Sequence, residues 1–276
     1  MGFLGAGDVS IFGSYYIFMN SSLLIILSAV VAAVVVSLIA FGSGLTGWNR
    51  AAIIFLAVVS LGVVWLIVTA ITQYQKRRLE EMVLAGAEVG LQLDEDKPGK
   101  NAIDPKPKYG SELAKKNAQV RYLFVGAMGD GGRTVRVFQH MYMVSAGQTA
   151  YPVYHRAGYV AVPKDWPTTR ICTKKKGKMR FGTWKKRKAA ILETEEFNKR
   201  FIVKSFDPEF AIILVNIELQ EALLRMSSKK AAWHIEAGRL WYIEKGGMSG
   251  EGLRSVLEGI SLFADYIHPA LWEEGE

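Results

Sequence analysis

Residues 120 to 144, VRYLFVGAMGDGGRTVRVFQHMYMV, carry the clearest structural signal in the chain. Apolar residues recur at every second position on both sides of the sequence GDGG, Gly129–Gly132, and this period is typical of β-strands with one buried face. Glycine and aspartate adopt the positive φ angles that a tight turn between two strands requires. The stretch therefore predicts an antiparallel β-hairpin.

Further strands and short helices are predicted downstream of this hairpin. YPVYHRAGYVAVP (151–163) reads as another strand or strand pair, and AAWHIEAGRLWYIEKG (231–246) as a second hairpin. Helix starts are expected at Thr194, at Asp207 followed by proline, and at Ser249, because these residue types cap helix N-termini. Residues 120–276 are therefore expected to form an α+β domain with a largely antiparallel sheet and several short helices.

The N-terminal part has a different composition. Residues 1–75 contain only two charged residues, Asp8 and Arg50, so the formal net charge of +8 belongs to the rest of the chain. Two uncharged runs, 21–41 and 51–71, would each reach about 31 Å as helices, close to the roughly 30 Å hydrocarbon core of a bilayer. The sequence predicts a transmembrane helical hairpin closed by an external loop, 42–50.

The flanking segments suggest how this anchor continues on both sides. Residues 1–20 are uncharged apart from Asp8 and rich in aromatic residues, which favours an interfacial lead-in. A juxtamembrane helix is expected over 72–92, because good helix formers follow the second span without interruption. Three prolines lie within 93–119, which is typical of a linker or long loop.

Basic residues at the span ends predict the orientation of the anchor. Lys76, Arg77 and Arg78 follow the second span directly, whereas the loop has Arg50 alone. Because basic residues are retained on the cytoplasmic side, we expect both termini in the cytoplasm and the protein in the inner (plasma) membrane.

Two stretches of the second part resemble a known family. GGRTVRVFQHMYM (131–143) and EEFNKRFIVKSFDPEFA (195–211) are similar to segments of uncharacterised actinobacterial or actinophage membrane proteins. That family has two N-terminal spans and a cytoplasmic domain of unknown function. The resemblance implies the same architecture and a bacterial or phage origin, and it supplies no catalytic residue.

No constellation of residues in the sequence predicts enzymatic chemistry. The four histidines are scattered, although His140 and His155 could meet on neighbouring strands, and the single cysteine, Cys172, excludes an intrachain disulfide. His140 is expected to share a face with Phe138 and Tyr142 in a half-buried aromatic patch. We therefore expect no catalytic residue, no metal site and no cofactor.

The basic segment, KKKGKMRFGTWKKRK (174–188), is the candidate functional feature of the sequence. It combines nine cationic side chains with two aromatic ones and has no acidic residue. The candidate lipid- or anion-binding residues are Lys174, Lys175, Lys176, Lys178, Arg180, Phe181, Trp184, Lys185, Lys186, Arg187 and Lys188.

Three interpretations of the basic segment remain open. Anionic headgroups attract polybasic segments, and a tethered domain meets lipid at high effective concentration. A solvated hairpin without a partner, or contact with nucleic acid or an acidic protein, would also fit. The leading prediction is a non-enzymatic membrane protein whose cytoplasmic domain is an interaction or sensing module oriented on anionic lipid, with a protein partner not specified. A membrane-tethered nucleic-acid-binding protein of phage or host defence is the alternative, and a hydrolase with an unrecognised site is a third.

Overall fold

The computed structural model describes residues 31, 47–94, 113, 118–128, 132–147, 149–174, 188–226, 231–268 and 271–272. The chain divides into two compact units, Met1–Arg78 and Leu79–Glu276. The predicted lead-in (1–20) and most of the first predicted span (21–41) lie outside the described residues.

One long helix, α2 (Gly47–Glu88, 42 residues), contains the second predicted span. The most apolar stretch within Val58–Glu88 has none of its residues buried inside the protein. Large apolar side chains such as Phe55 and Trp65 are exposed, at 68% and 66%. By length and composition this helix can cross a membrane, which supports one membrane anchor.

The bounds of α2 differ from the predicted segments at both ends. Gly47–Arg50, expected in an external loop, already belong to the helix, and the span and the juxtamembrane segment form one continuous element. The helix ends at Glu88, and Gly90 has a φ of +74°, which glycine adopts without steric cost. Leu91–Leu93, which the sequence assigns to helix and linker, instead form strand β1.

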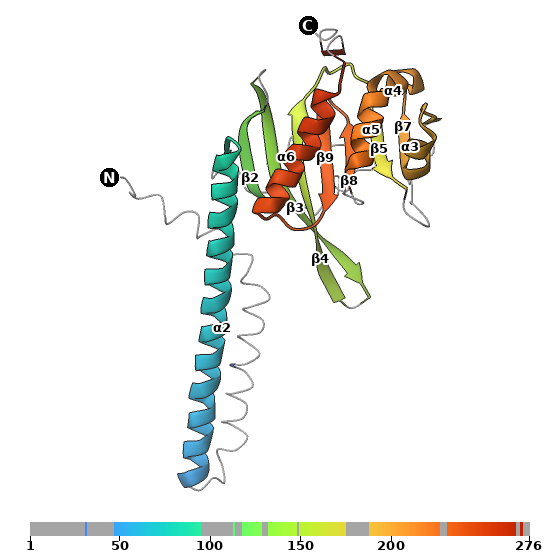
Figure 1. The fold of residues 1–276 in the computed structure, drawn as a ribbon. Helices are drawn as coiled ribbons and strands as arrows, with labels where there is room; N and C mark the ends of the chain where they lie inside the picture. The colour runs from blue at the N-terminus through green and yellow to red at the C-terminus, as the bar shows by residue number, and fades with distance from the viewer. Residues whose placement is uncertain are drawn as a thin grey trace, which may run out of the picture. The chain divides into compact units, whose positions relative to one another are not determined.

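The second unit is built on a nine-stranded sheet in the order β1-β2-β3-β4-β9-β8-β5-β7-β6 (Figure 1). The strands after β1 are β2 (Gln119–Met128), β3 (Arg133–Ala146), β4 (Thr149–Ala161), β5 (Thr169–Thr173), β6 (Lys188–Ala190), β7 (Phe201–Ser205), β8 (Ala231–Ile235) and β9 (Arg239–Lys245). Every recorded pair is antiparallel. The predicted α+β class and both predicted hairpins, β2–β3 and β8–β9, are confirmed.

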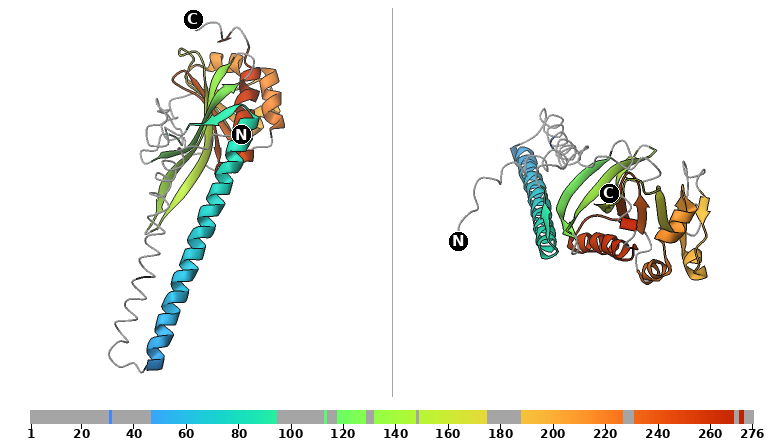
Figure 2. Two further views of the ribbon diagram at one scale, coloured as in Figure 1. Left: turned by 90° about the vertical axis from the view of Figure 1, so that its left-hand side faces the viewer. Right: turned by 90° about the horizontal axis from the view of Figure 1, so that it is seen from above.

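Four helices accompany the sheet, and the predicted helix starts are confirmed. They are α3 (Glu195–Arg200), α4 (Pro208–Leu214), α5 (Ile217–Arg225) and α6 (Gly250–Asp265). Asp207 and Ser249 accept backbone N–H groups of the first turns of α4 and α6, whereas Thr194 makes no cap hydrogen bond with its side chain. Figure 2 shows α4, α5 and α6 on one side of the strands.

The packing of α6 defines the helix-covered face of the sheet. Trp233 donates its indole N–H to the carbonyl of Gly259 at 2.8 Å and stacks on Phe263, with ring centroids 6.3 Å apart. Tyr242, opposite Trp233 in the register, packs edge-on against it. Because side chains alternate along a strand, their neighbours His234 and Trp241 point to the other face.

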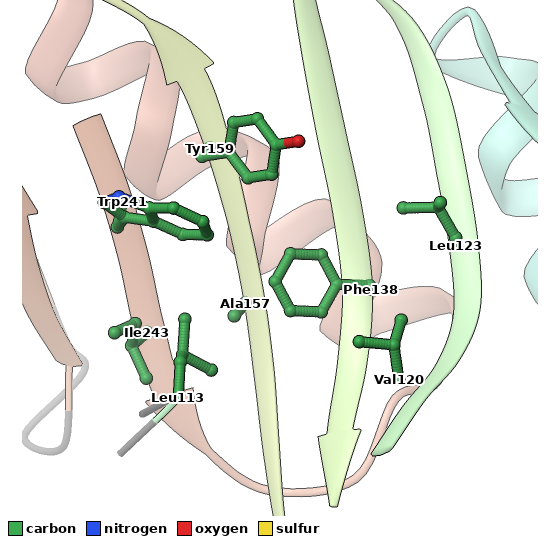
Figure 3. Packing of buried hydrophobic residues seen from close by; sticks show 8 residues of the cluster. All are labelled: Leu113, Val120, Leu123, Phe138, Ala157, Tyr159, Trp241 and Ile243. Atoms are coloured by element: carbon green, nitrogen blue, oxygen red, sulfur yellow. The ribbon is translucent and has the colours of Figure 1, made fainter. Parts of the chain in front are cut away.

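That second face carries its own buried cluster (Figure 3), on the side of the sheet away from α6. Its members come from four central strands and from one residue of the predicted linker: Leu113, Val120, Leu123, Phe138, Ala157, Tyr159, Trp241 and Ile243. Leu113 is 1% exposed. The sheet therefore buries apolar side chains on both faces.

The strands on either side of the basic segment are both neighbours of β7. β5 and β6 both pair antiparallel with β7 and lie on either side of it, so they are parallel to each other. The segment leaves β5 next to Thr173, opposite Phe201, and enters β6 at Lys188, opposite Ser205 at the other end of β7. β5 and β6 are therefore not paired with each other, and the three interpretations of the basic segment, whose residues 175–187 lie outside the described ones, stay predictions.

Candidate anion-binding face of the sheet

A row of polar and aromatic side chains crosses the sheet on the face opposite α6. Directly paired residues on neighbouring strands share a face, so the register defines the row. It runs from β7 to β3 through Lys204, Arg170, His234, Trp241, Tyr159 and Arg136. Arg239, two residues before Trp241 on β9, lies on the same face. With strands about 4.8 Å apart, five steps extend the row over about 24 Å.

Two arginines flank the tyrosine at the centre of the row. Arg136 donates from Nη1 to the Tyr159 hydroxyl at 3.0 Å, and the Arg239 guanidinium lies 4.7 Å from the Tyr159 ring centroid. Tyr159 in turn contacts Trp241, with centroids 4.5 Å apart. The negative face of an aromatic ring attracts a guanidinium and leaves its in-plane N–H donors directed outward. The aromatic pair thus orients two cations.

The other end of the row is also cationic. Arg170 and Lys204 are paired across β5 and β7, beside Cys172. Burial raises the pKa of the Cys172 thiol, and the positive charges of Arg170 and Lys204 act in the opposite direction. A neutral thiol is a poor nucleophile and a poor metal ligand. Cys172 is therefore a buried packing residue of this face.

One acidic group lies within the row. Glu236 is 4% exposed and its carboxylate contacts His234 Nε2 at 2.6 Å. This contact is local, because both groups belong to the β8–β9 hairpin. The four half-buried cations Arg136, Arg170, Lys204 and Arg239 are called the cationic row below.

The chemistry of the cationic row is that of anion binding. Guanidinium and ammonium groups donate charge-assisted hydrogen bonds to phosphate and carboxylate oxygens. The rings of Tyr159 and Trp241 are 6% and 0% exposed, so they are not available to stack on nucleic-acid bases. The described residues include no group of three or more His, Cys, Asp or Glu side chains that could hold a metal ion.

The two histidines that the sequence suggested could meet are indeed cross-strand neighbours. His140 and His155 pair directly between β3 and β4, and both are buried. Tyr142 stacks on His155 at 5.7 Å and lies 5.9 Å from the His140 ring. The prediction that His140 shares a face with Phe138 and Tyr142 is confirmed, but the patch is buried rather than half-buried.

The structure describes only part of the predicted basic segment. Lys174 is exposed, and its ammonium group donates to the carbonyl of Asn198. Lys188 is exposed at the start of edge strand β6. The other candidates, Lys175, Lys176, Lys178, Arg180, Phe181, Trp184, Lys185, Lys186 and Arg187, lie outside the described residues. Lys76, Arg77 and Arg78 lie on α2.

Sequence reasoning missed the cationic row because its four members lie on four different strands, β3, β5, β7 and β9. Period-two alternation places Arg136 on one face with Phe138, and Arg239 with Trp241. It does not specify which strands are neighbours or in which register. A search for cations two residues away from a buried aromatic residue on the same strand would have selected Arg136 and Arg239. It would not have selected Arg170 or Lys204.

Comparisons with known proteins identify no family. No family model matches the chain, and no curated protein matches it. Among solved structures, the crystal structure of the mycobacterial trehalose monomycolate transport factor A, TtfA, aligns with a TM-score of 0.47 and 10% sequence identity. The alignment covers 67% of this chain and 92% of that one. A likeness at this level assigns neither a family nor a function.

Proposed function

We propose that this chain is a membrane-anchored, non-enzymatic interaction protein whose α+β domain binds anionic lipid headgroups. The cationic row carries the proposal, because four cations from separate strands converge on one face of the sheet. Helix α2 supports the membrane anchorage. In this proposal the domain is cytoplasmic, as the basic residues after the predicted second span favour.

The length of the row favours an extended anionic surface over a small soluble ligand. A single phosphate group contacts only adjacent side chains, whereas Arg136 and Lys204 are separated by four intervening strands. A bilayer presents many headgroups at such spacings. Each cation near an anionic membrane surface contributes about 1 kcal/mol to binding. The basic segment would add to this attraction if it faces the same surface.

A nucleic acid is the alternative partner, because it is also an extended polyanion. The buried state of Tyr159 and Trp241 weighs against base stacking at this face. Phosphate contacts alone would give binding that is independent of sequence and falls steeply with salt. A free oligonucleotide therefore distinguishes the two partners, because it would compete for a nucleic-acid-binding surface.

The test uses the full chain held in nanodiscs of neutral lipid. These particles are mixed with neutral or anionic vesicles, with and without a single-stranded oligonucleotide, and the vesicles are sedimented. We expect co-sedimentation with anionic vesicles only, unchanged by the oligonucleotide. Equal recovery with neutral vesicles would contradict the proposal. Release by the oligonucleotide would favour the nucleic-acid alternative.

A further inference from the structure

The β3–β4 hairpin extends beyond the rest of the sheet as a two-stranded ribbon (Figure 1). Strand β2 pairs with β3 only as far as Met141, and β9 pairs with β4 only from His155. Residues 142–146 of β3 and 149–153 of β4 continue to pair with each other, from Tyr142–Val153 to Ala146–Thr149. This segment is called the β3–β4 ribbon.

The ribbon has an unusual composition for a surface hairpin. From Met141 to Tyr154 the sequence, MYMVSAGQTAYPVY, contains no Asp, Glu, Lys or Arg. Met143 is 47% exposed and Tyr151 is 50% exposed. A solvated antiparallel strand commonly alternates apolar with polar or charged residues. Here neither strand carries a charge.

Both faces of the ribbon present large apolar side chains and no charged one, and its polar residues Ser145 and Thr149 lie near its far end. One face presents Tyr142 and Val144 with their partners Val153 and Tyr151, and continues the aromatic patch of His140 and His155. The other face presents Met143 and its partner Pro152. Strands that are apolar on both faces are normally covered on both sides. An isolated two-stranded hairpin is at best marginally stable in water. The ribbon therefore has the composition of an element that is stabilised by an apolar environment.

We propose that the β3–β4 ribbon inserts into the headgroup region of a lipid bilayer. The chain carries an apolar helix able to span the membrane, so lipid is the apolar medium at highest effective concentration. Tyrosine side chains favour the membrane–water interface, and the flanking apolar residues bury in it. The distribution of charge fits this placement. The ribbon itself is neutral, and exposed Lys245 lies opposite His155 at the base of the ribbon. There an ammonium group would meet anionic headgroup oxygens.

A second copy of the chain is the competing occupant. Of the described strands, β2 pairs with β3 only up to Met141 and β9 pairs with β4 only from His155, and the edge of a sheet can accept another strand. Pro152 offers no N–H to an added strand, which disfavours pairing along β4. The experiment separates this outcome from lipid insertion.

The test attaches an environment-sensitive fluorophore to single cysteines in the full chain. Cys172 is the one native cysteine, so Cys172→Ser provides the background. Tyr151→Cys and Met143→Cys place the label on the two faces of the ribbon. Thr134→Cys, exposed at the opposite end of β3, is the matched control. The proteins are reconstituted in neutral vesicles containing lipids with a nitroxide near the headgroup.

We expect both ribbon labels to be quenched by the nitroxide lipids at least threefold more than the label at Thr134→Cys. Equal quenching at all three sites would overturn the inference. Protection of the ribbon labels from aqueous iodide without quenching by lipid would also overturn it, and would indicate a second copy instead. The inference rests on the proposed membrane anchorage but not on the cationic row. Neutral vesicles therefore keep its failure distinct from a failure of anionic-lipid binding.

Discussion

At the scale of single residues, Glu244 joins helix α6 to the sheet. Its carboxylate is 7% exposed, and Oε2 accepts hydrogen bonds from Arg156 Nε at 2.7 Å, Ser255 Oγ at 3.1 Å and Tyr242 Oη at 3.2 Å. The hydrogen bond that Arg156 donates to Glu244 raises the pKa of Arg156, so the guanidinium stays charged. One buried oxygen thus satisfies donors from β4, β9 and α6.

Replacing this carboxylate should destabilise the domain strongly. Glu244→Ala leaves a half-buried guanidinium without its counter-ion, a change that costs about 2 kcal/mol of unfolding free energy. Exposed Glu258 on α6 provides the control, since Glu258→Ala should stay within about 0.5 kcal/mol of wild type. Chemical denaturation of the full chain in detergent measures both, and equal midpoints would refute the role of Glu244.

The thiol of Cys172 should react slowly and only in unfolded protein. Burial raises its pKa, so the folded state favours the neutral form. The stability that the neutral thiol gives the folded state is fully present below the pKa of the thiol in the unfolded chain. It is lost as the pH rises through the pKa of the thiol in the folded chain. We expect a thiol-reactive chromophore at pH 8 to label the native chain many-fold more slowly than the denatured chain. Similar rates would show that the thiol is accessible.

At the scale of elements, α6 lies close against the sheet because Gly259 has no side chain. A Cβ at this position would lie 2.3 Å from Tyr242 Cε2, which is shorter than any real contact. Within a helix, alanine is more favourable than glycine by about 1 kcal/mol. Overpacking a core typically costs about 1–3 kcal/mol. We therefore expect Gly259→Ala to lower the free energy of unfolding by about 1 kcal/mol. A thermal melt tests the sign, and a raised melting temperature would contradict this packing.

The same scale explains which elements the sequence predicts. The β2–β3 and β8–β9 hairpins have local turns and regular alternation, and α4 has Asp207 and Pro208 at its start. β5, β6 and β7 are three to five residues long, and their partners are distant in sequence. Their pairing depends on tertiary contacts, so neither the strands nor the cationic row that crosses them follows from local pattern.

At the scale of the whole molecule, the sequence separates an apolar N-terminal part from a charged domain. The structure provides one helix able to span a membrane and an antiparallel α+β unit. The first predicted span and most of the basic segment lie beyond the described ranges and remain predictions. The proposed lipid binding rests on the cationic row of the second unit, and the further inference of bilayer insertion rests on the β3–β4 ribbon.

Charge removal distinguishes the contributions of the row and of the basic segment. The row variant combines Arg136→Gln with Arg239→Gln and so removes two charges from the cationic row. The segment variant replaces Lys185, Lys186, Arg187 and Lys188 with Gln and removes four charges from the basic segment. Lys199→Gln with Arg225→Gln removes two exposed charges from α3 and α5 as the control. Each cation at the surface is worth about 1 kcal/mol, so the row variant should lose at least about tenfold in affinity.

The most direct measurement is the binding of nanodisc-held wild type, row variant and control variant to anionic vesicles at one salt concentration. Lipid binding through the sheet face predicts that the control variant binds like wild type and that the row variant binds at least about tenfold more weakly. The row variant must melt at the wild-type temperature for the comparison to hold. Wild-type affinity in a folded row variant would contradict the central claim.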